Sequence, residues 1–355
     1  MSELHRRTSQ AIDAQLDRLA EEIVARQLEL QAERWKPYGS RGREKSVRDV
    51  RYHLTYLSEA LRVVNPSLFT DYVAWVKVLF AGLHFPDEVL VTTLECTRDT
   101  VQERLPVGLN AIASEYVALG LDHLRQAPAA LPAFLDQNAP LGGLARQYLG
   151  ALLRGERRIA SRLVLDAVEK GTSIKDVYLH VFQRSQYEIG RLWQMNQITV
   201  AQEHYCTAAT QLIMSQLYPH LFGTDRIGRR LVATCVGDEL HELGVRMVAD
   251  FFEMEGWDTY YVGANAPAQG ILEVIEEQEA DLLGISATMT FHVRNVAALI
   301  TRVRKAHTSR DVTILVGGYP FNVAPDLWQE LGADGHGRDA EEAVGLANRL
   351  LEGRK

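Results

Sequence analysis

The chain has few of the features that mark secreted or membrane-spanning proteins. Its 355 residues include only three cysteines, Cys96, Cys206 and Cys235, and their wide spacing gives neither a disulfide framework nor a zinc site. No apolar run approaches the length that spans a bilayer, and the polar N-terminus lacks the apolar core of a signal peptide. We therefore expect a reducing, cytoplasmic location and no contact with a membrane.

Basic residues are also in short supply. The chain has 38 Lys and Arg against 46 Asp and Glu, which gives a net charge of −8. Nucleic acids and anionic membranes are bound by clustered Lys and Arg, so neither is an expected partner. What remains is ordinary globular composition, 46% hydrophobic and 24% charged, in a chain long enough for two or three domains.

The first 140 residues predict an all-helical domain. Apolar residues recur at helical spacing from Ser9 to about Glu33, and Pro37 to Ser40 then break the pattern. Further helices are expected at about 47–64, 68–82, 86–105 and 109–125, with prolines or glycines near their ends.

Aromatic side chains crowd into one part of this domain, with His53 and His84 among them: Tyr52, Tyr56, Phe69, Tyr72, Trp75, Phe80 and Phe85. Such a cluster could line a pocket for a flat, conjugated ligand whose carboxylates meet Arg51, Arg62 or Lys77. The alternative is a packed core, which is the commoner use of aromatic residues at helical spacing. Cys96 could attach a tetrapyrrole covalently, although a single cysteine on a helix more often only packs.

The middle of the chain, about 141–225, predicts a four-helix bundle, because its helical stretches are joined by short links. Trp193 falls near the end of one helix, and Glu203 and His204 fall early in the next. All three could face one spot. Alternatively, Trp193 packs at a helix corner beside an exposed Glu-His pair.

The remainder, 226–355, switches to short apolar strands that alternate with helices. Strands are expected at about 230–236, 258–262, 282–286, 312–316 and 333–336, and helices at about 240–255, 268–279, 293–306, 322–331 and 339–351. Five such units predict a doubly wound parallel sheet, a flavodoxin-like or Rossmann-like α/β domain. The predicted domains are therefore 1–140, 141–225 and 226–355.

Ligands of such sheets bind beyond the carboxyl ends of the strands, at the switch between the first and third. The loop after the first strand holds Glu239 and His241, and the glutamate could hold one ring nitrogen while the other meets a metal. This loop predicts a metal-binding histidine at the edge of the sheet.

The loops after the third and fourth strands would complete a slot beside that histidine. Ser286 and Thr288 offer hydroxyl groups, and Gly317 and Gly318 would let a ligand lie against the backbone. Each feature alone has a structural explanation, such as a helix cap or a tight turn. Their coincidence at three loops that meet favours a ligand site.

The set Glu239-x-His241-x-x-Gly244, with Ser286-x-Thr288 and Gly317-Gly318, resembles the cobalamin-binding motif of the methionine-synthase and mutase type. The resemblance covers about 141–355. It implies that His241 is the lower axial ligand of cobalt, that Glu239 tunes it through a hydrogen bond, and that the nucleotide tail enters the slot past the two glycines.

The upper side resembles a different group. The pattern Trp193-x9-Glu203-His204 is similar to that of CarH-type photoreceptors, in which the Trp caps an upper ligand, typically adenosyl, and the Glu-His pair lies over the corrin. Gln194 stands where those proteins have a histidine that takes cobalt after photolysis, so His204 is the nearest upper ligand. Their MerR-type helix-turn-helix is absent, so direct DNA binding is not expected.

An all-helical, globin-like domain ahead of such a unit resembles the photocobilins, which bind a bilin such as biliverdin beside cobalamin. The chemistry of the side chains suggests five bilin contacts: His53, Tyr52, Tyr72, Trp75 and Arg51.

These resemblances lead to the hypothesis of a light sensor rather than an enzyme. Light would cleave the cobalt–carbon bond of an alkylcobalamin, and a bilin near the corrin would extend absorption to red wavelengths. Signalling would follow from a change in conformation, in homo-oligomeric assembly or in binding to a separate effector protein. The alternative is a corrinoid methyl-transfer protein whose N-terminal domain binds a partner or haem. A third interpretation is a sensor of cobalamin itself, without a response to light.

Overall fold

The computed structural model describes residues 3–306 and 312–353, which form two compact units. Unit 1 comprises Met1–Ala130 with the short segments Met289–Arg294 and Asn322–Glu330. Unit 2 comprises Leu131–Thr288, Asn295–Phe321 and Leu331–Lys355. Among the described residues, no helix is both long and apolar enough to cross a membrane. The bundle and the sheet share unit 2, so the predicted division into three domains stays a prediction.

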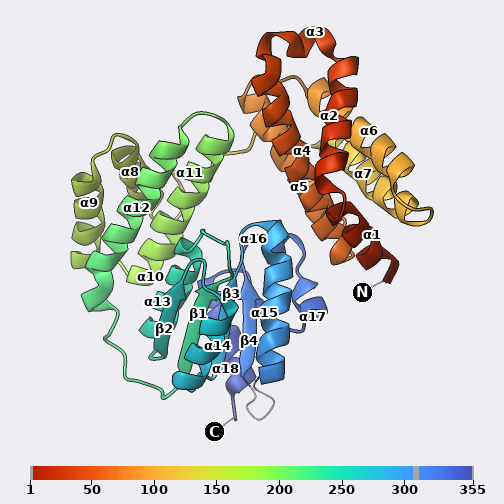
Figure 1. Ribbon diagram of the computed structural model, residues 1–355. Coiled ribbons are helices and arrows are strands. Elements are labelled where there is room, and N and C mark those ends of the chain that lie inside the picture. The colour runs from red at the N-terminus through yellow and green to blue at the C-terminus, as the bar shows by residue number, and fades with distance from the viewer. Residues whose placement is uncertain (1–2, 307–311, 354–355) are drawn as a thin grey trace. The chain divides into compact units, whose positions relative to one another are not determined.

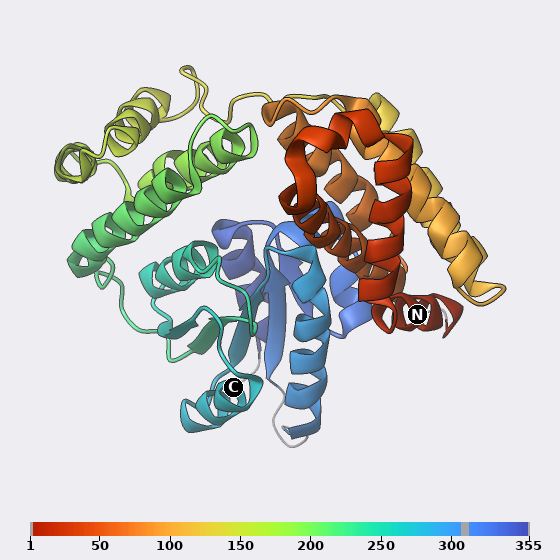
Figure 2. The same ribbon diagram turned by 45° about the horizontal axis from the view of Figure 1, so that its top comes forward.

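Unit 1 is helical, as expected. Its elements are α1 (Glu3–Asp13), α2 (Leu16–Leu30), α3 (Ala32–Trp35), η1 (Lys36–Tyr38), α4 (Gly39–Arg62), α5 (Ser67–Gly82), α6 (Asp87–Arg104) and α7 (Leu109–Gln126). Helix α4 packs against α1, α2 and α5, while α6 packs against α7 and α2 (Figures 1 and 2). Helix α4 begins at Gly39, well before the predicted start at Val47. The sequence pattern missed this part of the helix because its first turns are mostly exposed and polar and so show no apolar periodicity. The globin-like arrangement stays a prediction.

The aromatic cluster of unit 1 packs on itself. Tyr56 and Tyr72 stack with their ring centroids 3.6 Å apart, and Trp75 lies nearly parallel to Tyr72 at 6.4 Å. His53 is buried, and its Nδ1 lies 2.8 Å from the hydroxyl oxygen of Tyr72. Burial lowers the pKa of His53 to about 4, which keeps the ring neutral at physiological pH. The cluster is therefore explained as a core without any ligand.

The other predicted bilin contacts do not join this core. Tyr52 is half exposed, and Arg51 forms an ion pair with Asp17, Nε to Oδ1, at 2.9 Å. Cys96 is buried, and burial raises the pKa of its thiol, so it is a poor nucleophile for covalent attachment. The packing of these aromatic residues gives the bilin assignment no support, and the assignment stays a prediction.

Unit 2 begins with the helical bundle. Its elements are α8 (Gly142–Leu153), α9 (Arg157–Glu169), α10 (Ile174–Asp176), the π-helical η2 (Val177–Gln183), α11 (Arg184–Gln194), α12 (Val200–Leu217) and η3 (Tyr218–His220). Thr199 starts α12 through a capping box with Gln202. Buried residues of the bundle and of the sheet region belong to one continuous hydrophobic core, which includes Tyr148, Phe182 and Phe251.

The sheet has five parallel strands in the order β2-β1-β3-β4-β5, which confirms the doubly wound prediction. The strands are β1 (Arg230–Cys235), β2 (Asp258–Gly263), β3 (Leu282–Ser286), β4 (Thr313–Gly317) and β5 (Gly335–Gly337). Residues 231–235 of β1 are all buried, as expected for a central strand covered on both faces.

The helices that alternate with these strands along the chain are α13 (Leu243–Met254), α14 (Ala268–Glu277), η4 (Thr290–His292), α15 (Val293–Ala306), α16 (Tyr319–Val323), α17 (Leu327–Leu331) and α18 (Ala340–Leu351). Of these, η4 and most of α17 belong to unit 1. Helices α13 and α18 pack on each other, and Figure 1 shows α14 and α15 in front of the strands.

Helix α13 carries the polar contacts between bundle and sheet. The Tyr178 hydroxyl of η2 donates to Oδ2 of Asp250 at 2.7 Å, and both side chains are buried. One turn earlier on α13, Arg246 donates to the Ser215 hydroxyl at 2.8 Å. Burial raises the pKa of Asp250 from 3.8 to about 6, against the opposing effect of the tyrosine hydrogen bond.

The raised pKa of Asp250 predicts a stability that depends on pH. The folded chain binds this proton more tightly than the unfolded chain, so the free energy of unfolding should fall as the pH rises from about 4 to about 6. The loss should reach up to about 3 kcal/mol. In Asp250→Asn this component should vanish, which is checked by urea unfolding of both proteins at pH 4 and pH 7, with the exposed Asp225→Asn as control. An identical pH profile in wild type and Asp250→Asn would contradict the assignment.

Candidate functional site

The loop between β1 and α13 holds the predicted site. Helix α13 begins at Leu243 rather than at about 240, so His241 lies in the loop and not in the first helical turn. Asp238 adopts a left-handed conformation, with φ of 68°, and the Glu239 carboxylate accepts the backbone N–H of His241 at 3.1 Å. The Glu239 side chain thus takes the place of a backbone carbonyl as the acceptor for this N–H. The helix therefore starts only after His241.

Glu239 is the centre of this loop. Its side chain is 0% exposed, its Oε1 lies 2.5 Å from Nδ1 of His241, and its Oε2 accepts the backbone N–H of Thr288 at 2.8 Å. The imidazole itself is 57% exposed. With Nδ1–H donated to the carboxylate, Nε2 is the ring nitrogen left to bind a metal.

The electrostatics of the loop centre on His241. The hydrogen bond that its ring donates to Glu239 raises the pKa of His241, burial opposes this, and the negative charges of Glu239 and Glu203 add to the increase. Glu203 belongs to α12, so the bundle lies within electrostatic reach of the loop. Cys235 ends β1 nearby, and burial raises the pKa of its thiol to about 12.

The strand register brings the other predicted residues to the same edge. Cys235 pairs with Ser286, Ser286 with Gly317, and Gly317 with Gly337. Gly318 has φ of 101°, and a Cβ there would lie 2.1 Å from the carbonyl oxygen of Ala287. A glycine is therefore required at 318 by the neighbouring backbone, whether or not a ligand is bound.

Gly244 differs from Gly317 and Gly318. It is exposed on the first turn of α13, and a Cβ there would meet no atom within 4 Å. The space beside it is open, as it would be where a ligand lies against the helix. Among the glycines of the motif, Gly244 is thus the one at which the surrounding protein atoms would leave room for a side chain.

The three predicted residues of the bundle lie on two helices. Trp193 is half-buried near the end of α11, while Glu203 and His204 are in the first turn of α12. Nδ1 of His204 lies 2.5 Å from Oε2 of Glu203, and Thr207 donates to the other carboxylate oxygen at 3.1 Å. The His204 ring is 75% exposed, and Gln194 beside Trp193 is buried.

One residue of this loop with several long-range contacts was not predicted from the sequence. Glu242, next to His241, accepts hydrogen bonds from Gln211 of α12 at 2.9 Å, from the Tyr261 hydroxyl at 3.1 Å and from the backbone N–H of Ala264 at 3.2 Å. No local pattern distinguishes it from a solvated glutamate at a helix start. Its three partners lie far from it along the chain.

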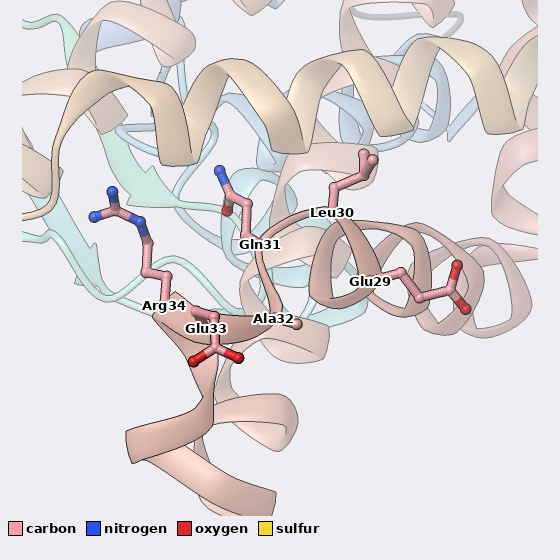
Figure 3. A pocket seen from close by; sticks show the side chains of 6 residues that line it. All are labelled: Glu29, Leu30, Gln31, Ala32, Glu33 and Arg34. Atoms are coloured by element: carbon pink, nitrogen blue, oxygen red, sulfur yellow. The ribbon is translucent and has the colours of Figure 1, made fainter.

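A surface pocket in unit 1 is not a candidate for this chemistry. It is lined by the single run Glu29–Arg34, at the turn between α2 and α3 (Figure 3). Leu30 is 71% exposed, and the lining brings no residue from a second part of the chain. A site that fixes a ligand requires polar groups that converge from several elements.

The raised pKa of His241 gives a direct test of the loop. In the cobalamin-free chain, Glu239→Gln should lower the pKa of His241, because it removes both the charge-assisted hydrogen bond and the nearby negative charge. Glu203→Gln should lower it less, since that carboxylate acts only through its charge. NMR titration of the imidazole signals measures both, and an equal effect of the two substitutions would contradict the geometry.

Comparison with known proteins identifies the cofactor. Residues 229–345 match the B12 binding domain family, and residues 144–218 match a second family with the same description. A corrinoid protein of Desulfitobacterium hafniense is 24% identical over 207 residues, which cover 57% of this chain and 94% of that protein. Dimethylamine corrinoid protein 2 of Methanosarcina acetivorans is 27% identical over 169 residues, 47% of this chain and 75% of that protein.

A solved structure shows the same fold. The monomethylamine corrinoid protein of Methanosarcina barkeri superposes with a TM-score of 0.54 at 19% identity, over 59% of this chain and 99% of that protein.

These relatives overturn the light-sensor hypothesis. They carry the names of corrinoid proteins, including those of dimethylamine, and so favour the alternative of a methyl-transfer protein. The Trp193 pattern lies on the bundle, in the region that matches a B12 binding domain family. Because corrinoid proteins are among the relatives of this chain, such a bundle does not distinguish a light sensor from a methyl-transfer protein. The adenosyl upper ligand and the light-dependent effector depended on the same resemblance.

The site fits the cofactor that the comparisons indicate. A buried carboxylate holds one nitrogen of an exposed imidazole, and open space adjoins Gly244 at the carboxyl edge of the sheet. The chain is therefore a cobalamin-binding protein whose matched domains span the bundle and the parallel sheet.

Proposed function

We propose that the protein is a corrinoid protein of a methyl-transfer system, which carries a methyl group between partner proteins. Bound cobalamin would supply a cobalt atom that accepts and releases the methyl group. The observation that supports this most is the Glu239–His241 pair at the switch point of the sheet, in a chain whose relatives are named corrinoid proteins. As a component of a methyltransferase system, the protein would act in catalysis together with its partners.

In this proposal Nε2 of His241 would hold the cobalt. The Thr288 N–H fixes the Glu239 carboxylate, and the carboxylate in turn fixes the orientation of the ring. A carboxylate on the far nitrogen also makes an imidazole a stronger donor to a metal. Because its pKa is raised, His241 would be protonated, and so lost as a ligand, at a higher pH than an isolated histidine.

The ends of β3 and β4 would receive the nucleotide tail. Ser286 and Thr288 supply hydroxyl groups beside the histidine loop, and Gly317 and Gly318 keep the strand ends free of side chains. Gly244 would lie against the corrin ring, where any side chain would intrude.

The bundle would cover the upper side. Trp193 offers an apolar surface, and Glu203 brings a negative charge within reach of His241. His204 is the exposed member of the Glu203–His204 pair and so the residue that a partner protein or substrate could meet. Transfer of a methyl group to and from partners requires such access.

The first test is the identity of the lower ligand. Purified protein is loaded with hydroxocobalamin and reduced, and the paramagnetic cobalt spectrum is recorded with ordinary and nitrogen-15-labelled histidine. We expect nitrogen splitting that changes with the histidine label, and this label-dependent splitting should be lost in His241→Ala. His204→Ala is the control and should keep it. Label-dependent splitting that survives in His241→Ala would refute the assignment.

Gly244 gives a test of the corrin face that separates binding from folding. Gly244→Leu should leave the free energy of unfolding unchanged or raise it by up to about 1 kcal/mol, because glycine is unfavourable inside a helix. Cobalamin affinity should fall by roughly tenfold or more, about 1.4 kcal/mol. Gly143→Leu, in the first turn of α8 and equally open, is the matched control and should bind normally. Titration followed by absorbance measures the affinity, and normal binding by Gly244→Leu would place the corrin elsewhere.

Methyl transfer is tested directly with the loaded, reduced protein. After treatment with iodomethane, a labelled methyl group should stay with the protein and leave for a thiol acceptor when a purified corrinoid-dependent methyltransferase is added. His241→Ala should slow this transfer. Stable retention of the label with every such partner would argue against the proposed function.

A further inference from the structure

The carboxylate of Glu242 joins three elements next to the proposed cobalt ligand. Oε1 accepts a hydrogen bond from Nε2 of Gln211 at 2.9 Å, and Oε2 accepts from the Tyr261 hydroxyl at 3.1 Å and from the Ala264 N–H at 3.2 Å. Gln211 belongs to the bundle helix α12, while the other two donors belong to β2 and to the loop after it. Glu242 therefore ties the bundle to the edge of the sheet, in addition to the contacts that α13 makes with Tyr178 and Ser215.

This arrangement places His241 between two anchored carboxylates. Glu239 is held by the end of β3 through the Thr288 N–H, and Glu242 is held by β2 and α12. Only Leu240 and His241 lie between the two glutamates in the chain. On the side of Glu239, the backbone next to His241 is fixed by a contact with the end of β3. On the side of Glu242, it is fixed by a contact with the bundle.

We propose that Gln211 is a positioning residue for His241. Through Glu242, its amide sets the backbone after the histidine, so that the orientation of the imidazole depends on whether α12 is docked on the loop. The part that concerns cobalt rests on the proposed function, whereas the coupling of Gln211 to the loop can be tested without cobalamin.

A purely structural role is a poor explanation of this contact. Helix α12 is held in the core by buried apolar residues, among them Ile213, Met214 and Leu217, so loss of one half-buried amide should not unfold the bundle. A second polar contact of α12, from Arg246 to Ser215, lies one turn further along both helices and does not touch the loop. Substitution at Ser215 therefore serves as a matched control.

The first experiment measures hydrogen exchange in the cobalamin-free chain. Gln211→Ala should raise exchange in peptides that cover 237–243 and 261–266 by about fivefold, the effect of losing one hydrogen bond. Ser215→Ala should leave both peptides unchanged. Gln211→Glu has the same length but places a carboxylate against Glu242, so it should raise exchange further, whereas Gln211→Lys keeps a donor and should restore protection.

The second experiment records the cobalt spectrum of the loaded, reduced protein. Gln211→Ala and Gln211→Glu should broaden the nitrogen splitting or remove it from part of the cobalt, and Gln211→Lys and Ser215→Ala should match the wild type. Unchanged exchange and unchanged spectra in Gln211→Glu would overturn the proposal. If exchange rises while His241→Ala keeps its nitrogen splitting, the coupling is supported and the proposed cobalt ligand is the part that fails.

Discussion

The site depends on one buried charge. The Glu239 carboxylate is fully buried, and a buried charge is tolerated only where hydrogen-bond donors compensate for the lost water. Its donors include the ring and backbone nitrogens of His241 and the backbone nitrogen of Thr288. The same bonds that stabilise this charge join the loop after β1 to the end of β3 and fix the imidazole. Removal of the carboxylate would therefore change the loop, the ring and the pKa of His241 together.

Helix α13 extends this constraint into the rest of unit 2. Its start follows the histidine loop, and its length carries Arg246 and Asp250 toward the bundle. The contact near the far end, Tyr178 with Asp250, is buried, whereas the contacts near the loop are more accessible to solvent. Burial opposes the ionised form of Asp250, so this buried contact loses stability as the pH rises, whereas exposed polar contacts contribute little.

Two sequence-based interpretations were wrong or lost their basis for related reasons. Trp193 and Glu203 lie on the bundle, but the chemistry proposed for that side depends on which partners reach it, and no residue spacing states that. Tyr72 and its neighbours were expected to line a pocket, but stacking and a hydrogen bond to His53 close the cluster on itself. In both cases the residue types were compatible with the function; the relatives overturned the first interpretation, and the packing leaves the second without support.

The sequence by itself determined the parallel sheet, the helical N-terminal region and the pairing of Glu239 with His241, because strand and helix periods and a two-residue spacing are local properties of the chain. The strand order was also predicted correctly, since the alternation of strands and helices leaves few topologies. Only the tertiary structure revealed the link from Gln211 to Glu242, which joins residues 31 positions apart, and the requirement for Gly318 beside Ala287. Such contacts form only when separate segments pack together, and no periodic pattern in the chain encodes which side chains will meet.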